Sequence, residues 1–202
     1  MARVHLFELH DQPWFPPAWR DLLTDYLSFY ARVFRPYDCV APLLAEALQQ
    51  AGSRRIVDLC SGGGEAVLSL RSGLERSGLG GLTITLTDKY PKPAAWRRAA
   101  ACGGGAVDSV GEAVDATRAP RALHGFRTLF TSLHHFRPHD ARAVLADAAA
   151  AREGIAAFEY TERNFLVWGL PLVLIPAFVW ITTPFMRRFG WSRPAFLIGF
   201  VL

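Results

Sequence analysis

The sequence Ile56-Val57-Asp58-Leu59-Cys60-Ser61-Gly62-Gly63-Gly64 combines an apolar strand, an acid near its end and a glycine-rich turn. A helical pattern begins directly after the turn, at Glu65. Glycines have no Cβ, so a ligand can approach their backbone closely, and the first N–H groups of the next helix have no partner within that helix. This stretch therefore predicts a binding site for a nucleotide-like ligand.

Two common nucleotide motifs do not fit these glycines. The dinucleotide fingerprint G-x-G-x-x-G fails in both frames, because a frame that starts at Cys60 ends on Glu65 and one that starts at Gly62 ends on Val67. A phosphate loop needs a lysine after its last glycine, and none follows here. The spacing thus argues against a dinucleotide, ATP or GTP as the ligand.

Strand-like and helix-like segments alternate around this turn. Short β-type segments are expected at residues 55–59, 82–86, 109–114, 128–132 and 155–160. Helices are expected at 65–76, 93–102 and 138–153, and two amphipathic helices precede them, at 19–34 and 40–48. Such alternation is typical of a parallel sheet with helices on both faces, so we predict an α/β fold.

The turn resembles motif I of the class I S-adenosylmethionine-dependent methyltransferases, which is an acid followed by G-x-G-x-G. Asp58 matches the acid, and Gly62 and Gly64 match the second and third glycines. Cys60 stands where this family has its first glycine, and its side chain must be accommodated there. The resemblance covers residues 54–160 and implies a Rossmann-like core whose motif residues contact the cofactor: Asp58, Cys60, Ser61, Gly62, Gly63 and Gly64.

Three later segments occur in the order that this family requires. Asp88 ends the second predicted strand, and the resemblance implies that its carboxylate accepts hydrogen bonds from the ribose hydroxyls, with Lys89 beside it. Asp115 and Ala116 follow the third predicted strand and would hold the adenine through an acidic side chain and a backbone N–H. Ser132 follows the fourth, in a loop that the resemblance places against the methyl donor.

His134 and His135 lie in the same loop. Imidazole can take a proton near neutral pH, so either histidine is a candidate catalytic base. Methyl transfer is an in-line displacement on an activated sulfonium, however, and positioning and desolvation can drive it without a base. A structural role for both histidines therefore stays open. Glu159, at the end of the fifth predicted strand, is a further candidate for contact with the substrate, because ligands bind beyond the carboxyl ends of parallel strands.

Composition limits the partners and the compartment. The chain has 202 residues, with 22 Lys and Arg against 18 Asp and Glu, and its net charge is only +4. Because the basic residues are scattered, we expect no nucleic-acid partner. Cys39, Cys60 and Cys102 are too widely spaced for a disulfide framework or a CxxC metal site, so no metal is expected. The N-terminus does not resemble a secretory signal, and a cytoplasmic protein is expected.

The C-terminal region is unusually apolar. Residues 165–183 carry no charge, and as a helix they would be about as long as the hydrocarbon core of a bilayer is thick. The arginines that follow oppose a simple crossing from the cytoplasm. We expect either membrane-surface association through residues 165–202 or an apolar lid on the core, with an ordinary buried helix as the third possibility. Residues after 160 show no antiparallel hairpin, so the sheet is expected to lack the last strands of this family.

Together these observations predict three regions: an N-terminal helical cap at 1–53, a Rossmann-like cofactor-binding core at 54–163 and a hydrophobic C-terminal segment at 164–202. The expected activity is transfer of a methyl group from S-adenosyl-L-methionine to a small, apolar acceptor. The alternative is a membrane-associated protein whose methyltransferase-like domain is degenerate and does not catalyse the reaction.

Overall fold

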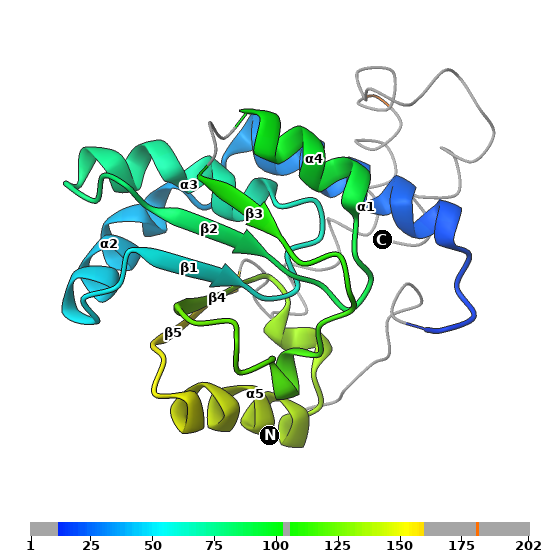
Figure 1. Cartoon of the computed structure of the whole chain (residues 1–202). Helices are drawn as coiled ribbons and strands as arrows, with labels where there is room; N and C mark the ends of the chain where they lie inside the picture. Colours follow the sequence, from blue (N-terminus) through cyan, green and yellow to red (C-terminus); the bar gives the residue numbers. More distant parts are fainter. Residues whose placement is uncertain (1–11, 103–105, 160–180, 182–202) are drawn as a thin grey trace, which may run out of the picture. The chain divides into compact units, whose positions relative to one another are not determined.

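The computed structural model describes residues 12–102, 106–159 and 181 (Figure 1). The chain divides into two compact units. One consists of Met1–Tyr30 and Thr161–Leu202, and most of helix α1 (Pro17–Phe34) belongs to it. The other, Ala31–Tyr160, contains the whole described sheet and carries every predicted site residue. The predicted boundaries at residues 53 and 163 stay a prediction.

Five parallel strands form the sheet of the second unit, in the order β3-β2-β1-β4-β5. The strand order reverses direction at β1, so β1 and β4 flank the point where successive connections leave in opposite directions. In open α/β sheets, ligands bind beyond the carboxyl ends of the strands at such a switch point. The strands are β1 (Arg55–Asp58), β2 (Thr83–Leu86), β3 (Val107–Ser109), β4 (Phe126–Phe130) and β5 (Ile155–Phe158).

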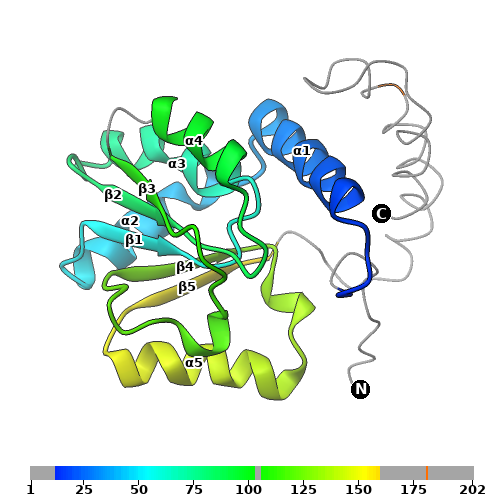
Figure 2. The same cartoon turned by 45° about the vertical axis from the view of Figure 1, so that its right-hand side comes forward.

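Helices cover both faces of the sheet (Figure 2). Successive residues of a strand point to opposite faces, and here the residues on both faces are apolar, so each face packs against helices. Ile56 packs with residues of α2 (Ala41–Gln50), α3 (Glu65–Arg76) and α4 (Pro93–Cys102). Val57, the next residue, packs on the opposite face with the short helix η3 (Ala116–Arg118) and α5 (Pro138–Ala151). Two further short helices are η2 (Asp38–Val40) and η4 (Leu133–His135).

The predicted α/β fold is confirmed, but two strands lie elsewhere than expected. The third strand is Val107–Ser109 rather than 109–114, since the backbone beyond Ser109 turns away after Val110 N–H donates to the Leu86 carbonyl. The fourth strand begins and ends earlier than predicted, at Phe126–Phe130, because Thr131 takes a positive φ of 44° that no strand can continue.

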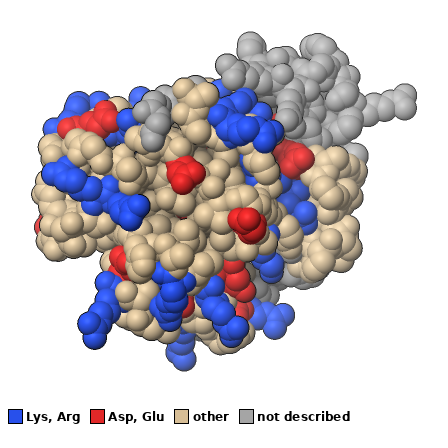
Figure 3. All heavy atoms as spheres, viewed as in Figure 1, with Lys and Arg blue, Asp and Glu red and all other residues tan. Residues whose placement is uncertain are grey.

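The apolar segment 165–183 lies outside the described residues, apart from Ile181. Within the described ranges, no helix has both the length and the apolar character that a membrane crossing requires. On the face seen in Figure 3, Lys and Arg side chains stand in separate groups, with Asp and Glu side chains between several of them.

Candidate functional site

The glycine-rich turn lies at the carboxyl end of β1 and is tied to the end of β2 through Ser61. The Ser61 N–H donates to the Thr87 carbonyl at 2.9 Å, and the Ser61 hydroxyl donates to the Asp58 carbonyl at 2.8 Å. The Ser61 carbonyl in turn accepts the Gly64 N–H at 2.7 Å. Ser61 therefore fixes the shape of the turn from inside, so that the turn is held in place without help from a ligand.

Gly62 and Gly64 serve different purposes, although both have a positive φ, of 53° and 89°. A Cβ on Gly64 would lie 2.8 Å from Leu86 Cδ1, so this glycine lets α3 begin close against β2. A Cβ on Gly62 would meet no atom within 4 Å. Gly62 therefore presents bare backbone to open space, as a site for a ligand requires.

Cys60 takes the conformation that a glycine would adopt at the first motif position. Its φ is 57°, a region that costs a non-glycine residue about 1–2 kcal/mol. Thr131, at the end of the neighbouring strand β4, has a φ of 44°. A strained residue thus follows each of the two strands at the switch point, and such strain concentrates at functional sites.

Asp88 lies against the turn from the end of β2. Its Oδ2 accepts the Gly62 N–H at 2.8 Å, and its Oδ1 accepts the Tyr90 N–H at 2.8 Å. The indole Nε1 of Trp96, on α4, donates to the Gly62 carbonyl at 2.9 Å. Asp88 and Trp96 therefore hold the backbone of Gly62 on both sides, Asp88 at its N–H and Trp96 at its carbonyl.

Asp58 plays an interior part. Its side chain is 2% exposed, and its Oδ1 accepts the Thr128 hydroxyl at 2.6 Å across the β1–β4 pair. Burial raises the pKa of Asp58 to about 7, although the hydrogen bonds from Thr128 and Ser61 oppose this rise and the Asp88 charge adds to it. Asp58 therefore links β1 to β4 and to the glycine-rich turn from the protein interior, and its carboxylate finds its hydrogen-bond partners within the protein.

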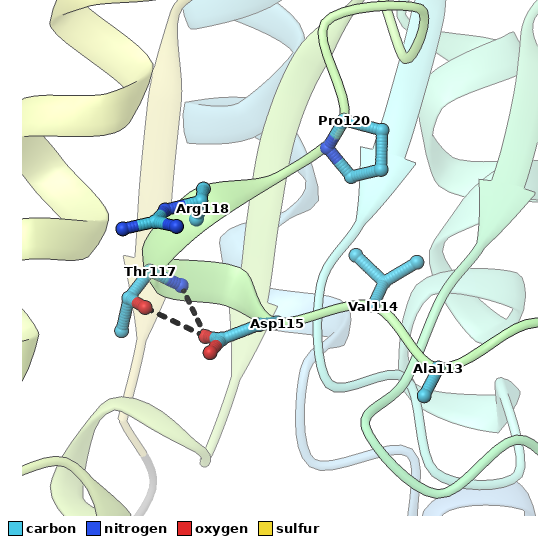
Figure 4. Close-up of a pocket in the computed structure, with 6 residues that line it drawn as sticks. All are labelled: Ala113, Val114, Asp115, Thr117, Arg118 and Pro120. Atoms are coloured by element: carbon cyan, nitrogen blue, oxygen red, sulfur yellow. Dashed lines mark hydrogen bonds between the residues drawn. The ribbon is translucent and has the colours of Figure 1, made fainter.

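Asp115 lies beside a pocket of about 420 Å³, to which it contributes together with its neighbours (Figure 4). The prediction that Asp115 directly follows the third strand is wrong, because β3 ends at Ser109 and Asp115 instead caps η3: its Oδ1 accepts the Thr117 N–H at 2.9 Å and the Thr117 hydroxyl at 2.7 Å. The Thr117 hydroxyl lowers the pKa of Asp115, and the charges of Lys89 and Arg118 act in the same direction. The pocket is lined by Ala113, Val114, Asp115, Thr117, Arg118 and Pro120.

The Asp115 segment is brought to Asp88 by one backbone bond, from the Val114 N–H to the Asp88 carbonyl at 2.9 Å. Ala116 is buried and packs in the same apolar cluster as Val57 and Leu59 of the β1 end. The structure thus gathers the turn, Asp88, Lys89 and the Asp115 pocket at one edge of the sheet.

Ser132 and the two histidines follow β4 at the same edge. The Ser132 Oγ is buried and has no hydrogen-bond partner among the described residues. His134 Nδ1 lies 2.6 Å from Glu159 Oε2, and the rings of His134 and His135 are 4.2 Å apart. The Leu133 N–H donates to the other carboxylate oxygen of Glu159 at 2.8 Å.

Glu159 is held in its ionised form by these contacts. Burial alone would raise its pKa, but the hydrogen bond and the charge of His134, with the N–H groups of Leu133 and Ser132, lower it below the usual value. These hydrogen bonds therefore connect the loop after β4 to the end of β5.

Two further residues of this edge were not predicted from the sequence. Trp96, which is 1% exposed, stands in an alanine-rich helix whose pattern gave it no special role. Glu65, the first residue of α3, has a buried Oε2 without a hydrogen-bond partner in the described part of the chain. The sequence offers one weak clue to each. Trp96 is an aromatic residue without an apolar periodicity around it, and Glu65 is an acid directly after the glycine-rich turn. Among the described residues, no three His, Cys, Asp or Glu side chains gather as a metal site would require.

Comparison with known proteins bears on the fold. No protein-family model and no curated protein matches this chain. A solved structure that does match is that of an O-methyltransferase family protein from Burkholderia thailandensis, with 19% sequence identity and a TM-score of 0.51. The match covers 79% of this chain but 47% of that protein, so the chain spans about half of the neighbour's length. At this identity the likeness establishes the fold, which is methyltransferase-like.

Proposed function

We propose that this protein is a class I S-adenosylmethionine-dependent methyltransferase that acts on a small, apolar acceptor. The observation that carries the proposal is the uncrowded backbone of Gly62: a Cβ there would meet no atom within 4 Å, its φ is positive, and the Asp88 carboxylate accepts its N–H. Bare backbone and an acid at adjacent strand ends suit an adenosyl ligand, which needs close approach and an acceptor for its ribose hydroxyls.

The residues at this edge fit such a cofactor. Asp88 has two carboxylate oxygens, each with more than one lone pair, so it can accept ribose hydroxyls while it keeps the N–H groups of Gly62 and Tyr90. The Asp115 pocket, at about 420 Å³, is large enough for an adenine ring, and Ala116 follows with its backbone N–H. When bound, the cofactor supplies a methyl group on a positively charged sulfur.

Two buried polar atoms without hydrogen-bond partners in the described residues support a ligand with a polar end. Glu65 Oε2 and Ser132 Oγ are buried without partners among the described residues, and buried polar atoms normally have one. A carboxylate oxygen beside the start of α3 suits the ammonium group of a methionyl moiety. The fold likeness to a methyltransferase family protein supports the same assignment.

Calorimetric titration with S-adenosylhomocysteine, the demethylated product, tests this proposal. We expect the wild-type chain to bind it and Asp88→Ala to bind at least about tenfold more weakly, since a charge-assisted hydrogen bond is lost. Asp108→Ala is the matched control, because this acid lies on β3 with its Oδ1 on the next N–H, of Ser109, and should leave binding unchanged. No heat with the wild-type chain would favour the alternative, a non-catalytic methyltransferase-like domain.

A further inference from the structure

Both polar backbone groups of Gly62 are bonded to one short stretch of the chain, the connection from β2 into α4. The Gly62 N–H donates to Asp88 Oδ2 at 2.8 Å, and the Gly62 carbonyl accepts the indole Nε1–H of Trp96 at 2.9 Å. The two partners lie 26 and 34 positions further along the chain. The conformation of the glycine-rich turn therefore depends on side chains from a distant segment.

These two hydrogen bonds fix both backbone dihedral angles of Gly62. The N–H belongs to the peptide plane before its Cα and the carbonyl to the plane after it, so Asp88 and Trp96 set the orientation of both planes. Glycine has the widest choice of φ and ψ, and holding it in one conformation costs more entropy than for any other residue. A ligand that needs the observed φ of 53° binds more tightly to a turn that already has it.

The bond from Trp96 serves the turn alone. Asp88 has a second task, because the proposed function has its carboxylate accept the ribose hydroxyls as well. An indole N–H is a single donor and cannot accept, so the contact of Trp96 with the Gly62 carbonyl stays the same when a ligand arrives. The hydrogen bonds inside the turn join residues on either side of Gly62, with the Gly64 N–H on the Ser61 carbonyl.

Trp96 acts on the turn from the protein interior. Its side chain is 1% exposed and belongs to the apolar cluster that contains Ile84 and Leu86 of β2. A Cβ on Gly62 would meet no atom within 4 Å, so the indole leaves that side of the glycine clear. An effect of Trp96 on a ligand over Gly62 is therefore transmitted through the backbone of the turn.

We infer that Trp96 is a positioning residue of the cofactor site, whose indole N–H keeps the glycine-rich turn in the conformation that S-adenosylmethionine binds. This inference rests on the proposed function. The competing interpretation is that Trp96 only fills the core. In that case its loss destabilises the fold but leaves the affinity of the folded protein for the ligand unchanged.

The test removes the N–H of Trp96 and keeps the volume of its side chain. Benzothienylalanine, introduced in place of Trp96 in the full chain, has a sulfur where the indole has its N–H. Trp96→Phe is a second variant that also lacks the donor. Phe126→Leu is the matched control, because Phe126 is buried in the same apolar cluster but lies at the amino end of β4, away from the turn.

Hydrogen exchange measured by NMR reports on the turn without any ligand. We expect the Gly62 and Gly64 N–H groups to exchange about tenfold faster in both Trp96 variants, since a turn that loses one hydrogen bond opens more often. The Leu59 N–H, which donates to the Thr128 carbonyl, is the internal reference. In Phe126→Leu the exchange of the two glycines relative to Leu59 should equal that of the wild-type chain. Unchanged relative exchange in both Trp96 variants would overturn the inference.

Calorimetric titration with S-adenosylhomocysteine, far below the unfolding temperature of each variant, measures the consequence for binding. We expect the affinity to fall about tenfold in both Trp96 variants, because binding must then also pay for ordering Gly62. Phe126→Leu should bind as the wild-type chain does, although it is less stable. If Trp96→Phe does not fold, the benzothienylalanine variant decides, because it keeps the packing of the indole.

The outcomes separate this inference from the proposed function. Wild-type affinity in the benzothienylalanine variant, or an equal loss of affinity in Phe126→Leu, would overturn the role of Trp96 and leave the proposed function standing. Absence of binding by the wild-type chain would overturn the proposed function, and the positioning of a cofactor with it.

Discussion

Of the four non-glycine residues with positive φ in the described part of the chain, two lie at the sheet edge that carries the glycine-rich turn. These two are Cys60 and Thr131, which follow β1 and β4, the strands that flank the switch point. Thr131 is also bonded to the Tyr37 hydroxyl at 2.6 Å, and Tyr37 packs edge-on against Phe130. The surrounding contacts therefore hold a conformation that the residue alone would avoid.

Gly62→Ala separates backbone strain from ligand binding. The new Cβ meets no protein atom, so we expect a loss of only about 1–2 kcal/mol in unfolding free energy from the positive φ, but a large loss of S-adenosylhomocysteine affinity. Gly52→Ala is the control, because Gly52 has a φ of 62°, is equally uncrowded and lies before β1, at the other end of the sheet. Chemical denaturation and calorimetry measure the two effects. Equal affinity in both variants would show that no ligand approaches Gly62.

Asp58→Asn tests the cause of the raised pKa. The folded-state pKa of about 7 lies above the unfolded value of 3.8, so ionisation is disfavoured in the fold, and wild-type stability falls as pH rises through this range. Asparagine keeps an oxygen for the Thr128 hydroxyl and carries no charge. Between about pH 5.5 and pH 8.5, we expect the free energy of unfolding of the variant to rise by about 2 kcal/mol relative to that of the wild-type chain, as measured by urea unfolding. A gap that does not change with pH would contradict this account.

At the scale of elements, a buried ion pair joins β4 to α5. Arg127 is 1% exposed, and its Nη1 lies 2.7 Å from Asp147 Oδ2. The Ala119 N–H also donates to this carboxylate, at 3.3 Å, so the loop after η3 is tied to the same point. The Nε and Nη2 atoms of Arg127 have no partner within the described residues, which makes Asp147 the main compensation for its charge.

Removing Asp147 should therefore be costly. We expect Asp147→Ala to lose about 3–5 kcal/mol of unfolding free energy, because it leaves a buried guanidinium without its carboxylate. Asp140→Ala on the same helix, where the partner is the exposed His139, should lose at most about 1 kcal/mol. The double variant Arg127→Met with Asp147→Leu should be closer to the wild-type chain than Asp147→Ala alone. A double variant less stable than Asp147→Ala would show that the pair itself stabilises the fold.

The elements that the sequence predicted well are those with strong local signals. The β1 strand, the glycine turn and α3 were placed correctly, because an apolar run, glycines and a helical repeat follow one another there. The third strand was misplaced, since Val107 and Val110 both suit a strand and only the pairing with β2 decides between them. The buried Arg127 of β4 contradicts the apolar pattern of a central strand, and its partner comes from α5, far along the chain.

At the scale of the whole molecule, the alternation of strand and helix patterns predicted the fold, and the order of acids and glycines predicted that the turn, Asp88 and Asp115 come together at one edge of the sheet. Neither pattern could predict that Asp115 caps η3 or that Glu159 reaches His134, because both depend on where the chain folds back. The roles of Gly62, Asp88 and Asp115 toward a cofactor stay proposals, as does the action of residues 165–202 at a membrane surface.

The membrane prediction has its own test. If residues 165–202 bind a membrane surface, the full chain should sediment with vesicles of anionic lipid, and deletion of this segment should abolish the sedimentation. High salt should weaken the effect if the arginines contribute to it. Sedimentation that is the same with and without the segment would contradict the prediction.

The most direct measurement is a crystal structure of the chain grown with S-adenosylhomocysteine. We predict ligand density along the carboxyl ends of β1 and β2, with the ribose hydroxyls within hydrogen-bonding distance of Asp88, the amino-acid end over Gly62 and the adenine beside Asp115. Density in another part of the molecule, or an empty strand edge at saturating ligand with Asp88 bonded only to Gly62 and Tyr90, would contradict the account.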